Sequence, residues 1–127
     1  MRVYLAGPIN GCTDEEAKDW RLLCKVLHPD VEWIDPMVRD YRGKEAECYK
    51  EIVELDKKDI DLCDLLVVSY TKPSVGTSME ILYAWERQKP VVLVCKAGEN
   101  LSPWLLYHVR RIVHSYQDIL DKIACRT

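Results

Sequence analysis

Two carboxylate side chains occupy positions that suggest a chemical role, one on the apolar face of a predicted helix and one near the start of the next. Asp56 falls on the apolar face of a helix predicted from about Ala46 to Cys63. Glu80 follows Gly76 near the start of the next predicted helix. Burying a carboxylate costs on the order of several kcal/mol unless it is paired or hydrogen-bonded. A carboxylate nucleophile with a second acid is the set that cleavage of a glycosidic bond requires, so both residues are candidates for that chemistry.

Each acid also has a structural explanation. Asp56, like Asp59 beside it, is equally well placed at the wet margin of its helix. Thr77 and Glu80 have the spacing of a capping box, in which two side chains bond the free N–H groups at the start of a helix. Taken alone, Glu80 favours the cap. The catalytic hypothesis gains weight because Glu80 would face a glycine-containing loop while Asp56 lies on the apolar face of the preceding helix.

Two such loops follow predicted strands. The first is Gly7–Gly11, and the second runs from Tyr70 to Gly76. A glycine directly before a helix leaves N–H groups free to bind an anion or a phosphate. Neither a Walker loop nor a G-x-G-x-x-G fingerprint is present. The loops therefore indicate an anion site of another kind.

The elements that would position these residues alternate between apolar strands and amphipathic helices. Strands are predicted at 2–6, 31–34, 65–68, 90–94 and 111–114. Helices are predicted to start near Thr13, Ala46, Ser78, Ser102 and Ser115. Glu16 would complete a capping box with Thr13. The helix from Ser102 is short, and the helix from Ser115 is predicted to run to about Cys125. This alternation predicts an α/β fold, a flavodoxin-like doubly wound five-stranded parallel sheet of order 2-1-3-4-5 flanked by helices. Both glycine loops then meet at the carboxyl edge of the sheet, and 37–44 is expected to be a mobile loop that covers the site.

Length and composition limit the classes of protein. The 127 residues predict one domain, 1–127, and a net charge of -3 argues against a nucleic-acid partner. No apolar run approaches a membrane span and no signal-peptide pattern opens the chain, so a cytoplasmic protein with no membrane partner is expected. The six cysteines are scattered without a C-x-x-C pair, so neither a metal nor another cofactor is expected.

Three segments share their pattern with one family. They are Val-Tyr-Leu-Ala-Gly-Pro at 3–8, Asp56 eight residues before Asp-Leu-Leu-Val-Val, and Pro-Ser-Val-Gly-Thr-Ser-Met-Glu-Ile-Leu-Tyr-Ala at 73–84. Together they resemble the nucleoside 2-deoxyribosyltransferase superfamily, which includes the deoxynucleoside 5'-monophosphate N-glycosidases. The resemblance extends from residue 3 to about residue 104.

The resemblance implies a retaining double displacement. Glu80 would attack the anomeric carbon of a deoxyribose and form a covalent glycosyl ester. Asp56 would position the sugar and the nucleophile or assist protonation of the base, and the hydroxyl of Tyr4 would lie near the nucleophile. The first loop would bind substrate through Gly7, Pro8, Ile9 and Asn10.

The resemblance also bears on the 5' end of the substrate. Six residues before the nucleophile, the transferases usually carry an acid for the 5'-hydroxyl, whereas the monophosphate hydrolases carry a serine, as Ser74 does here. A carboxylate there would repel a phosphate, so Ser74 with Gly76 favours a nucleotide. Ser102 matches a serine that reaches the phosphate from a neighbouring subunit in the hydrolases. Its alternative is the N-cap of the short helix that follows.

Other positions favour a free nucleoside. Pro8 and Asn10 replace a serine and an arginine of the hydrolases' first loop, and Asn100 resembles a partner-subunit asparagine of the transferases. The cations that would compensate for the missing arginine are Arg39, Arg42 and Lys72.

The favoured hypothesis is an N-glycosidase that hydrolyses a 2'-deoxyribonucleoside 5'-monophosphate to the free base and deoxyribose 5-phosphate. A deoxyribosyltransferase that exchanges bases between deoxynucleosides is the enzymatic alternative. A nucleotide-binding sensor is the non-enzymatic one, against which Tyr4, Asp56 and Glu80 argue together. The expected partners are a small-molecule substrate and a second copy of the chain, in a homodimer or larger assembly that shares the active site. No residue indicates which base is recognised.

Overall fold

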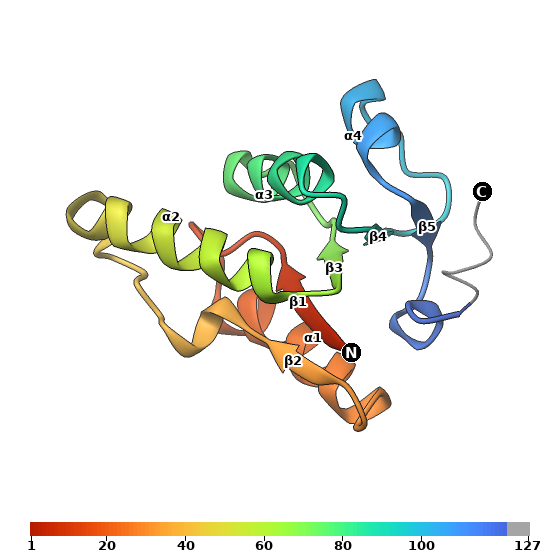
Figure 1. The fold of residues 1–127 in the computed structure, drawn as a ribbon, viewed down its shortest axis with the longest axis horizontal. Helices are drawn as coiled ribbons and strands as arrows, with labels where there is room; N and C mark the ends of the chain where they lie inside the picture. The colour runs from red at the N-terminus through yellow and green to blue at the C-terminus, as the bar shows by residue number, and fades with distance from the viewer. Residues whose placement is uncertain (122–127) are drawn as a thin grey trace.

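A five-stranded parallel sheet forms the centre of the protein (Figure 1). The computed structural model describes residues 1–121. The strands are β1 (Arg2–Ala6), β2 (Glu32–Ile34), β3 (Leu65–Ser69), β4 (Val91–Val94) and β5 (Arg111–Val113). They lie in the order β2-β1-β3-β4-β5 and every neighbouring pair is parallel, which confirms the predicted fold class.

Helices cover both faces of this sheet. One face carries α2 (Glu45–Leu62), α3 (Val75–Glu86) and α4 (Pro103–His108), and the other carries α1 (Asp14–Leu27) and the 3-10 turn η2 (Tyr116–Asp118) (Figure 1). Side chains alternate along a strand, so Tyr4 packs on the α2–α3 side whereas Val3 and Leu5 pack with Trp20 of α1. Every residue of β3 is buried, as expected for a strand covered on both faces.

The register brings the predicted ligand loops together. Ala6 at the end of β1 pairs with Val68 near the end of β3. The loop after β1 and the loop after β3 therefore leave the sheet at neighbouring points of its carboxyl edge. This is the position at which doubly wound folds bind their ligands.

Helix α3 begins three residues earlier than predicted. Its N-cap is Ser74, whose hydroxyl accepts the N–H of Thr77 at 3.3 Å, and the helix starts at Val75 rather than Ser78. Thr77 is therefore inside the helix, and its capping box with Glu80 does not form. The prediction placed Gly76 directly before the helix, whereas the serine two residues earlier supplies the cap and Gly76 lies in the first turn.

The C-terminal helix predicted from Ser115 is wrong over the part that the structure describes. Ser115 precedes only η2, and the rest of the prediction, to Cys125, extends beyond residue 121. Tertiary contacts account for the short turn, because the ring of Tyr116 stacks on Trp20 at 5.9 Å and its hydroxyl lies 2.6 Å from Ser69 Oγ.

The other predicted boundaries agree with the observed ones to within two residues. The capping box at the start of α1 is confirmed, with Thr13 N–H donating to Glu16 at 2.9 Å and Glu16 N–H donating back at 3.1 Å. The segment 37–44 is irregular apart from the 3-10 turn η1 (Pro36–Val38). Within residues 1–121, no helix has the combination of length and apolar character that would cross a membrane.

Candidate active site

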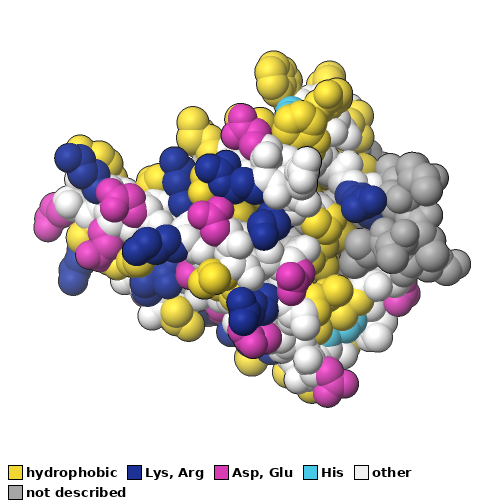
Figure 2. All heavy atoms as spheres, in the orientation of Figure 1, with side chains coloured by type: hydrophobic (Ala, Val, Ile, Leu, Met, Phe, Trp, Pro, Cys, Tyr) yellow, Lys and Arg dark blue, Asp and Glu magenta, His cyan; other side chains and the backbone are white. Residues whose placement is uncertain are grey.

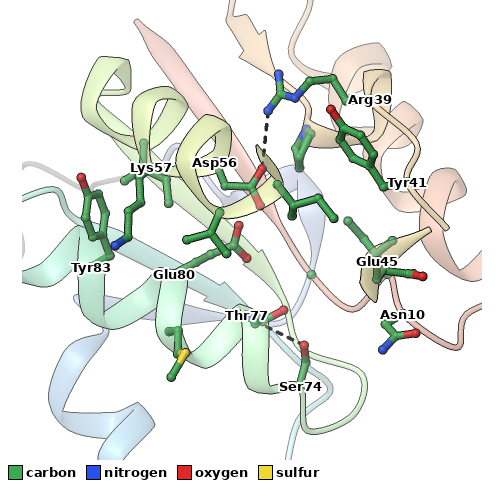
Figure 3. A pocket seen from close by; sticks show the side chains of 18 of the residues that line it. Asn10, Arg39, Tyr41, Glu45, Asp56, Lys57, Ser74, Thr77, Glu80 and Tyr83 are labelled. Atoms are coloured by element: carbon green, nitrogen blue, oxygen red, sulfur yellow. Dashed lines mark hydrogen bonds and ion pairs between the residues drawn. The ribbon is translucent and has the colours of Figure 1, made fainter. Parts of the chain in front are cut away.

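A cavity of about 470 Å³ opens at the carboxyl edge of the sheet, within the size range of sites for small molecules. Its walls come from the loop after β1, the segment after β2, and helices α2 and α3 (Figure 3). Seven of the site residues predicted from sequence line it: Gly7, Ile9, Asn10, Asp56, Ser74, Gly76 and Glu80. The structure thus brings together residues from four separate segments.

Tyr4 joins this group through Glu80. Its hydroxyl donates a hydrogen bond of 2.5 Å to Glu80 Oε2, and its ring is fully buried. Strand β1 points Tyr4 toward α3, where it packs with Ile81 in the core on that side of the sheet. The bond fixes the direction of the Glu80 carboxylate, which lines the cavity.

The surface of α3 before Glu80 is open. Gly76 lies four residues earlier, on the same face of the helix, and a Cβ built there would meet no atom within 4 Å. A side chain at this position would stand in the cavity next to Glu80. The missing side chain therefore leaves space for a ligand directly over the carboxylate.

Glu80 holds its proton unusually tightly. Burial is the main cause that raises the pKa of Glu80 to about 8, and the negative charge of Asp56 contributes to the increase. The hydrogen bond from Tyr4 and the positive charge of Arg21 oppose this shift of the pKa. The carboxyl is thus balanced between its neutral and ionised forms near physiological pH.

Asp56 lies on α2 across the cavity from α3 (Figure 3). Burial raises the pKa of Asp56 to about 6, while Arg39 acts to lower it. The guanidinium of Arg39 lies 3.4 Å from Asp56 and 2.6 Å from Asp59, so it ties the segment after β2 to α2. Asp56 is therefore a paired and partly buried acid at the margin of the apolar face of α2.

Arg21 was missed in the sequence. It is 1% exposed, and its guanidinium donates to the carbonyl oxygens of Ala17 at 2.5 Å and of Leu5 and Gly7 at 3.4 Å each. Asp35 faces it at 3.4 Å. The signal was its spacing of four residues from buried Ala17, which places Arg21 on the buried face of α1. The buried cation holds the start of the first loop in place.

Gly7 is required by close packing. A Cβ on Gly7 would lie 2.7 Å from Cζ2 of Trp20, closer than nonbonded carbons approach. Only glycine therefore lets the first loop cross over α1 at this point.

The candidate cations differ in their positions. Arg39 and Arg42 line the cavity, whereas Lys72 is exposed and lies outside its wall. Arg42 is engaged by Asp14 at 2.7 Å and Asp40 at 2.6 Å. Both cavity arginines are thus held by carboxylates within the chain.

Three predicted residues lie away from the cavity wall. Pro8 belongs to the first loop, but it is buried and does not line the cavity. Asn100 and Ser102 are exposed near α4, where the hydroxyl of Ser102 accepts the N–H of Trp104 at 3.1 Å and serves as the N-cap. Neither residue reaches the cavity of its own chain. Among residues 1–121, no group of three or more His, Cys, Asp or Glu side chains is arranged to hold a metal ion.

The fold and the cavity define an α/β protein with paired acids at the carboxyl edge of a doubly wound sheet. Residues 3–119 match the family model described as "Nucleoside 2-deoxyribosyltransferase". The chain therefore belongs to this family, which is a family of enzymes.

Several solved structures have a similar fold. A conserved protein from Enterococcus faecalis has a TM-score of 0.76 at 20% identity, covering 99% of this chain and 98% of that one. A 2-deoxyribosyltransferase from Bacillus psychrosaccharolyticus has a TM-score of 0.74 at 17% identity, with 95% and 91% covered. A CMP N-glycosidase from Clostridium botulinum has a TM-score of 0.64 at 21% identity, with 98% and 99% covered. No curated protein matches the sequence.

Proposed function

We propose that the protein hydrolyses the N-glycosidic bond of a 2'-deoxyribonucleoside 5'-monophosphate through a covalent glycosyl-Glu80 intermediate. The observation that carries this proposal is the 2.5 Å hydrogen bond from Tyr4 to Glu80 at the wall of a cavity that Asp56 also lines. A carboxylate fixed in direction, next to a second acid, has the composition of a retaining glycosidase site.

The two acids divide the chemistry between them. An oxygen of Glu80 forms a bond to C1' as the bond from C1' to the base nitrogen breaks, and the electron pair of that bond goes to the base. Asp56 supplies the proton that the leaving base takes up. Water then attacks C1', the bond to Glu80 breaks, and the proton of the water returns to Asp56. The products are the free base and deoxyribose 5-phosphate.

The pKa of Asp56 supports this role. Burial raises that pKa to about 6, close enough to neutrality for the group to give and take a proton within one turnover. Tyr4 has a different role from Asp56. Its hydroxyl donates a hydrogen bond to Glu80 and so orients the attacking carboxylate.

The start of α3 favours a 5'-phosphate. Ser74 and Gly76 line the cavity at the N-terminus of this helix, where free N–H groups and the helix dipole stabilise an anion. No carboxylate stands at position 74 to repel it. The CMP N-glycosidase of similar fold has a monophosphate substrate by its name, which agrees with this assignment.

Base exchange between deoxynucleosides is the second candidate. The first loop, Gly-Pro-Ile-Asn-Gly, carries no cation, and both arginines at the cavity are already paired with carboxylates. A phosphate would thus have to rely on the start of α3. The family name and the 2-deoxyribosyltransferase of similar fold also favour this candidate.

One set of incubations separates the two reactions. The protein is incubated with each deoxynucleoside and each 5'-monophosphate, with and without a free acceptor base, and products are resolved by chromatography. Release of deoxyribose 5-phosphate without an acceptor supports hydrolysis, whereas a new nucleoside formed only with the acceptor supports transfer. Glu80→Gln is the control for contaminating activity. Failure of the wild-type protein to release any base would overturn both candidates.

We propose that a second copy of the chain completes the site. Asn100 and Ser102 lie outside the cavity of their own chain and directly precede α4, which carries exposed aromatic side chains. Figure 2 shows hydrophobic side chains gathered on the surface over α4. Trp104 is 75% exposed and Tyr107 is 69% exposed, an apolar surface suited to a protein partner. Light scattering should give at least a dimer, and Trp104→Glu should yield monomers with reduced activity. A fully active monomer would contradict this arrangement.

A further inference from the structure

The hydroxyl of Thr77 is a buried polar group without a partner. Thr77 is 5% exposed and lines the cavity, and its Oγ1 forms no hydrogen bond with any residue that the structure describes. Its backbone N–H is satisfied by Ser74, so the side chain is not needed to cap the helix. Buried hydroxyls are nearly always hydrogen-bonded, because an unmatched one loses its bonds to water and gains nothing. The exception at a cavity wall points to a ligand as the missing partner.

Thr77 lies between the two ends of the proposed substrate site. On helix α3 it is three residues after Ser74 and three before Glu80, which corresponds to about 4.5 Å along the helix axis in each direction. Figure 3 shows Thr77 between these two side chains. If the phosphate is at Ser74 and C1' is at Glu80, then Thr77 lies beside the middle of the pentose ring.

The stereochemistry of the reaction selects one atom of the ring. In a β-nucleoside the base and C5' are on one face of the pentose, and the 3'-hydroxyl is on the other. Glu80 displaces the base from the opposite face, so α3 lies on the side of the 3'-hydroxyl. Thr77 is on the same face of α3 as Glu80. The 3'-hydroxyl of the sugar therefore faces the side of α3 on which Thr77 lies.

We propose that Thr77 Oγ1 hydrogen-bonds the 3'-hydroxyl of the substrate, so that the site requires a pentose with a free 3'-hydroxyl. This inference rests on the proposed function and adds a limit on the substrate class. A 3'-phosphorylated nucleotide, or a nucleotide within a DNA strand, has no free hydroxyl to offer. The enzyme then acts on free mononucleotides or nucleosides only.

The test measures binding and separates this contact from catalysis. The monophosphate that the wild-type protein cleaves fastest is titrated calorimetrically into Glu80→Gln protein, beside its 2',3'-dideoxy analogue. Thr77→Val has nearly the same shape but no hydroxyl. In this background it should weaken binding of the 3'-hydroxylated nucleotide roughly 3- to 10-fold, the range of one neutral hydrogen bond. Binding of the dideoxy analogue should stay the same.

Two further variants sharpen the comparison. Thr77→Ser keeps a hydroxyl and should recover most of the lost affinity. Ser78→Ala removes a hydroxyl from the exposed neighbour, whose Oγ donates to the carbonyl of Ser74 outside the cavity, and should leave both affinities unchanged. The melting temperature of Thr77→Val should equal or exceed that of the wild type, because no internal hydrogen bond is lost.

The outcomes distinguish the two proposals. If the wild-type protein releases no base from any substrate, the proposed function fails and this inference falls with it. If base is released but Thr77→Val weakens both ligands equally or neither, the contact with the 3'-hydroxyl alone is overturned. A clear drop in the melting temperature of Thr77→Val would also overturn it, since the hydroxyl would then serve the fold.

Discussion

The hydroxyl of Tyr4 on β1 lies 2.5 Å from Oε2 of Glu80 on α3, across 76 positions of sequence. A single hydrogen bond thus connects the central sheet to the proposed nucleophile. It orients the carboxylate and, by donating to it, favours the ionised form.

Replacing Tyr4 by Phe removes this bond with little change in packing. The pKa of Glu80 should rise, because the hydrogen bond that lowers it is lost while burial and Asp56 still raise it. We expect kcat to fall about 10- to 100-fold, with the alkaline limb of the pH profile, which follows the higher pKa of the pair, moved to higher pH. An unchanged profile with unchanged kcat would show that Tyr4 serves only the core.

The pH dependence of the wild-type enzyme should be bell-shaped. The reactive state has one proton on the pair, on Asp56 while Glu80 is ionised. Because the pKa of Glu80 is the higher of the two, this proton lies mostly on Glu80, and the reactive state is the minor arrangement of the singly protonated pair. The pKa values of about 6 and about 8 belong to a coupled pair, and between them the pair holds one proton. We therefore expect kcat/KM to peak near pH 7 and to fall on both sides. Asp56→Asn should lower activity and abolish the alkaline limb, and an alkaline limb that persisted would contradict the assignment of the acid.

Glu80→Gln should separate chemistry from stability. An amide cannot form the glycosyl ester, so turnover should fall by several orders of magnitude. The pKa of Glu80 is raised in the folded protein from 4.5 to about 8, so the folded state binds this proton more tightly than the unfolded chain. The free energy of unfolding therefore falls as pH rises between these values, and Gln removes this loss. Denaturant unfolding should show Glu80→Gln gaining stability over wild type at pH 9 relative to pH 5.

Ser74→Asp tests the phosphate end of the site. Aspartate is as good an N-cap as serine, so α3 and the fold should be retained. Its negative charge would face a phosphate at the start of α3, so kcat/KM for a monophosphate should fall at least about 10-fold more than for the corresponding nucleoside. Equal losses on both substrates would contradict the phosphate assignment, and circular dichroism checks the fold.

Two glycine variants form a matched pair. Gly7→Ala places a Cβ 2.7 Å from Trp20, so we expect a loss of about 1–3 kcal/mol in the free energy of unfolding, together with lower activity. Gly76→Ala meets no protein atom, so it should leave stability unchanged or raise it by up to about 1 kcal/mol. Its methyl group enters the cavity beside Glu80, so KM should rise. Thermal melts and steady-state kinetics on both variants check the contrast.

The sequence alone determined the sheet, its strand order and the two glycine loops that meet at the cavity. Apolar runs separated by amphipathic helices specify a parallel sheet, and the connection rules then place the loops after β1 and β3 side by side. Asp56 and Glu80 became candidates because a carboxylate in an apolar pattern, or next to a glycine at a helix start, is a local signal, and the family resemblance then favoured the catalytic hypothesis over the structural explanations. Signals of this kind depend on residues close together in the chain.

Only the tertiary structure decided how these groups act on one another. The contact between Tyr4 and Glu80, the pairing of Arg39 with Asp56, and the buried position of Arg21 each depend on segments far apart in sequence. The start of α3 and the short turn at Tyr116 were also misjudged, because a cap at Ser74 and packing on Trp20 outweigh local propensity. Hydrogen bonds, burial and the resulting pKa values depend on distances in space, which neither composition nor spacing along the chain contains.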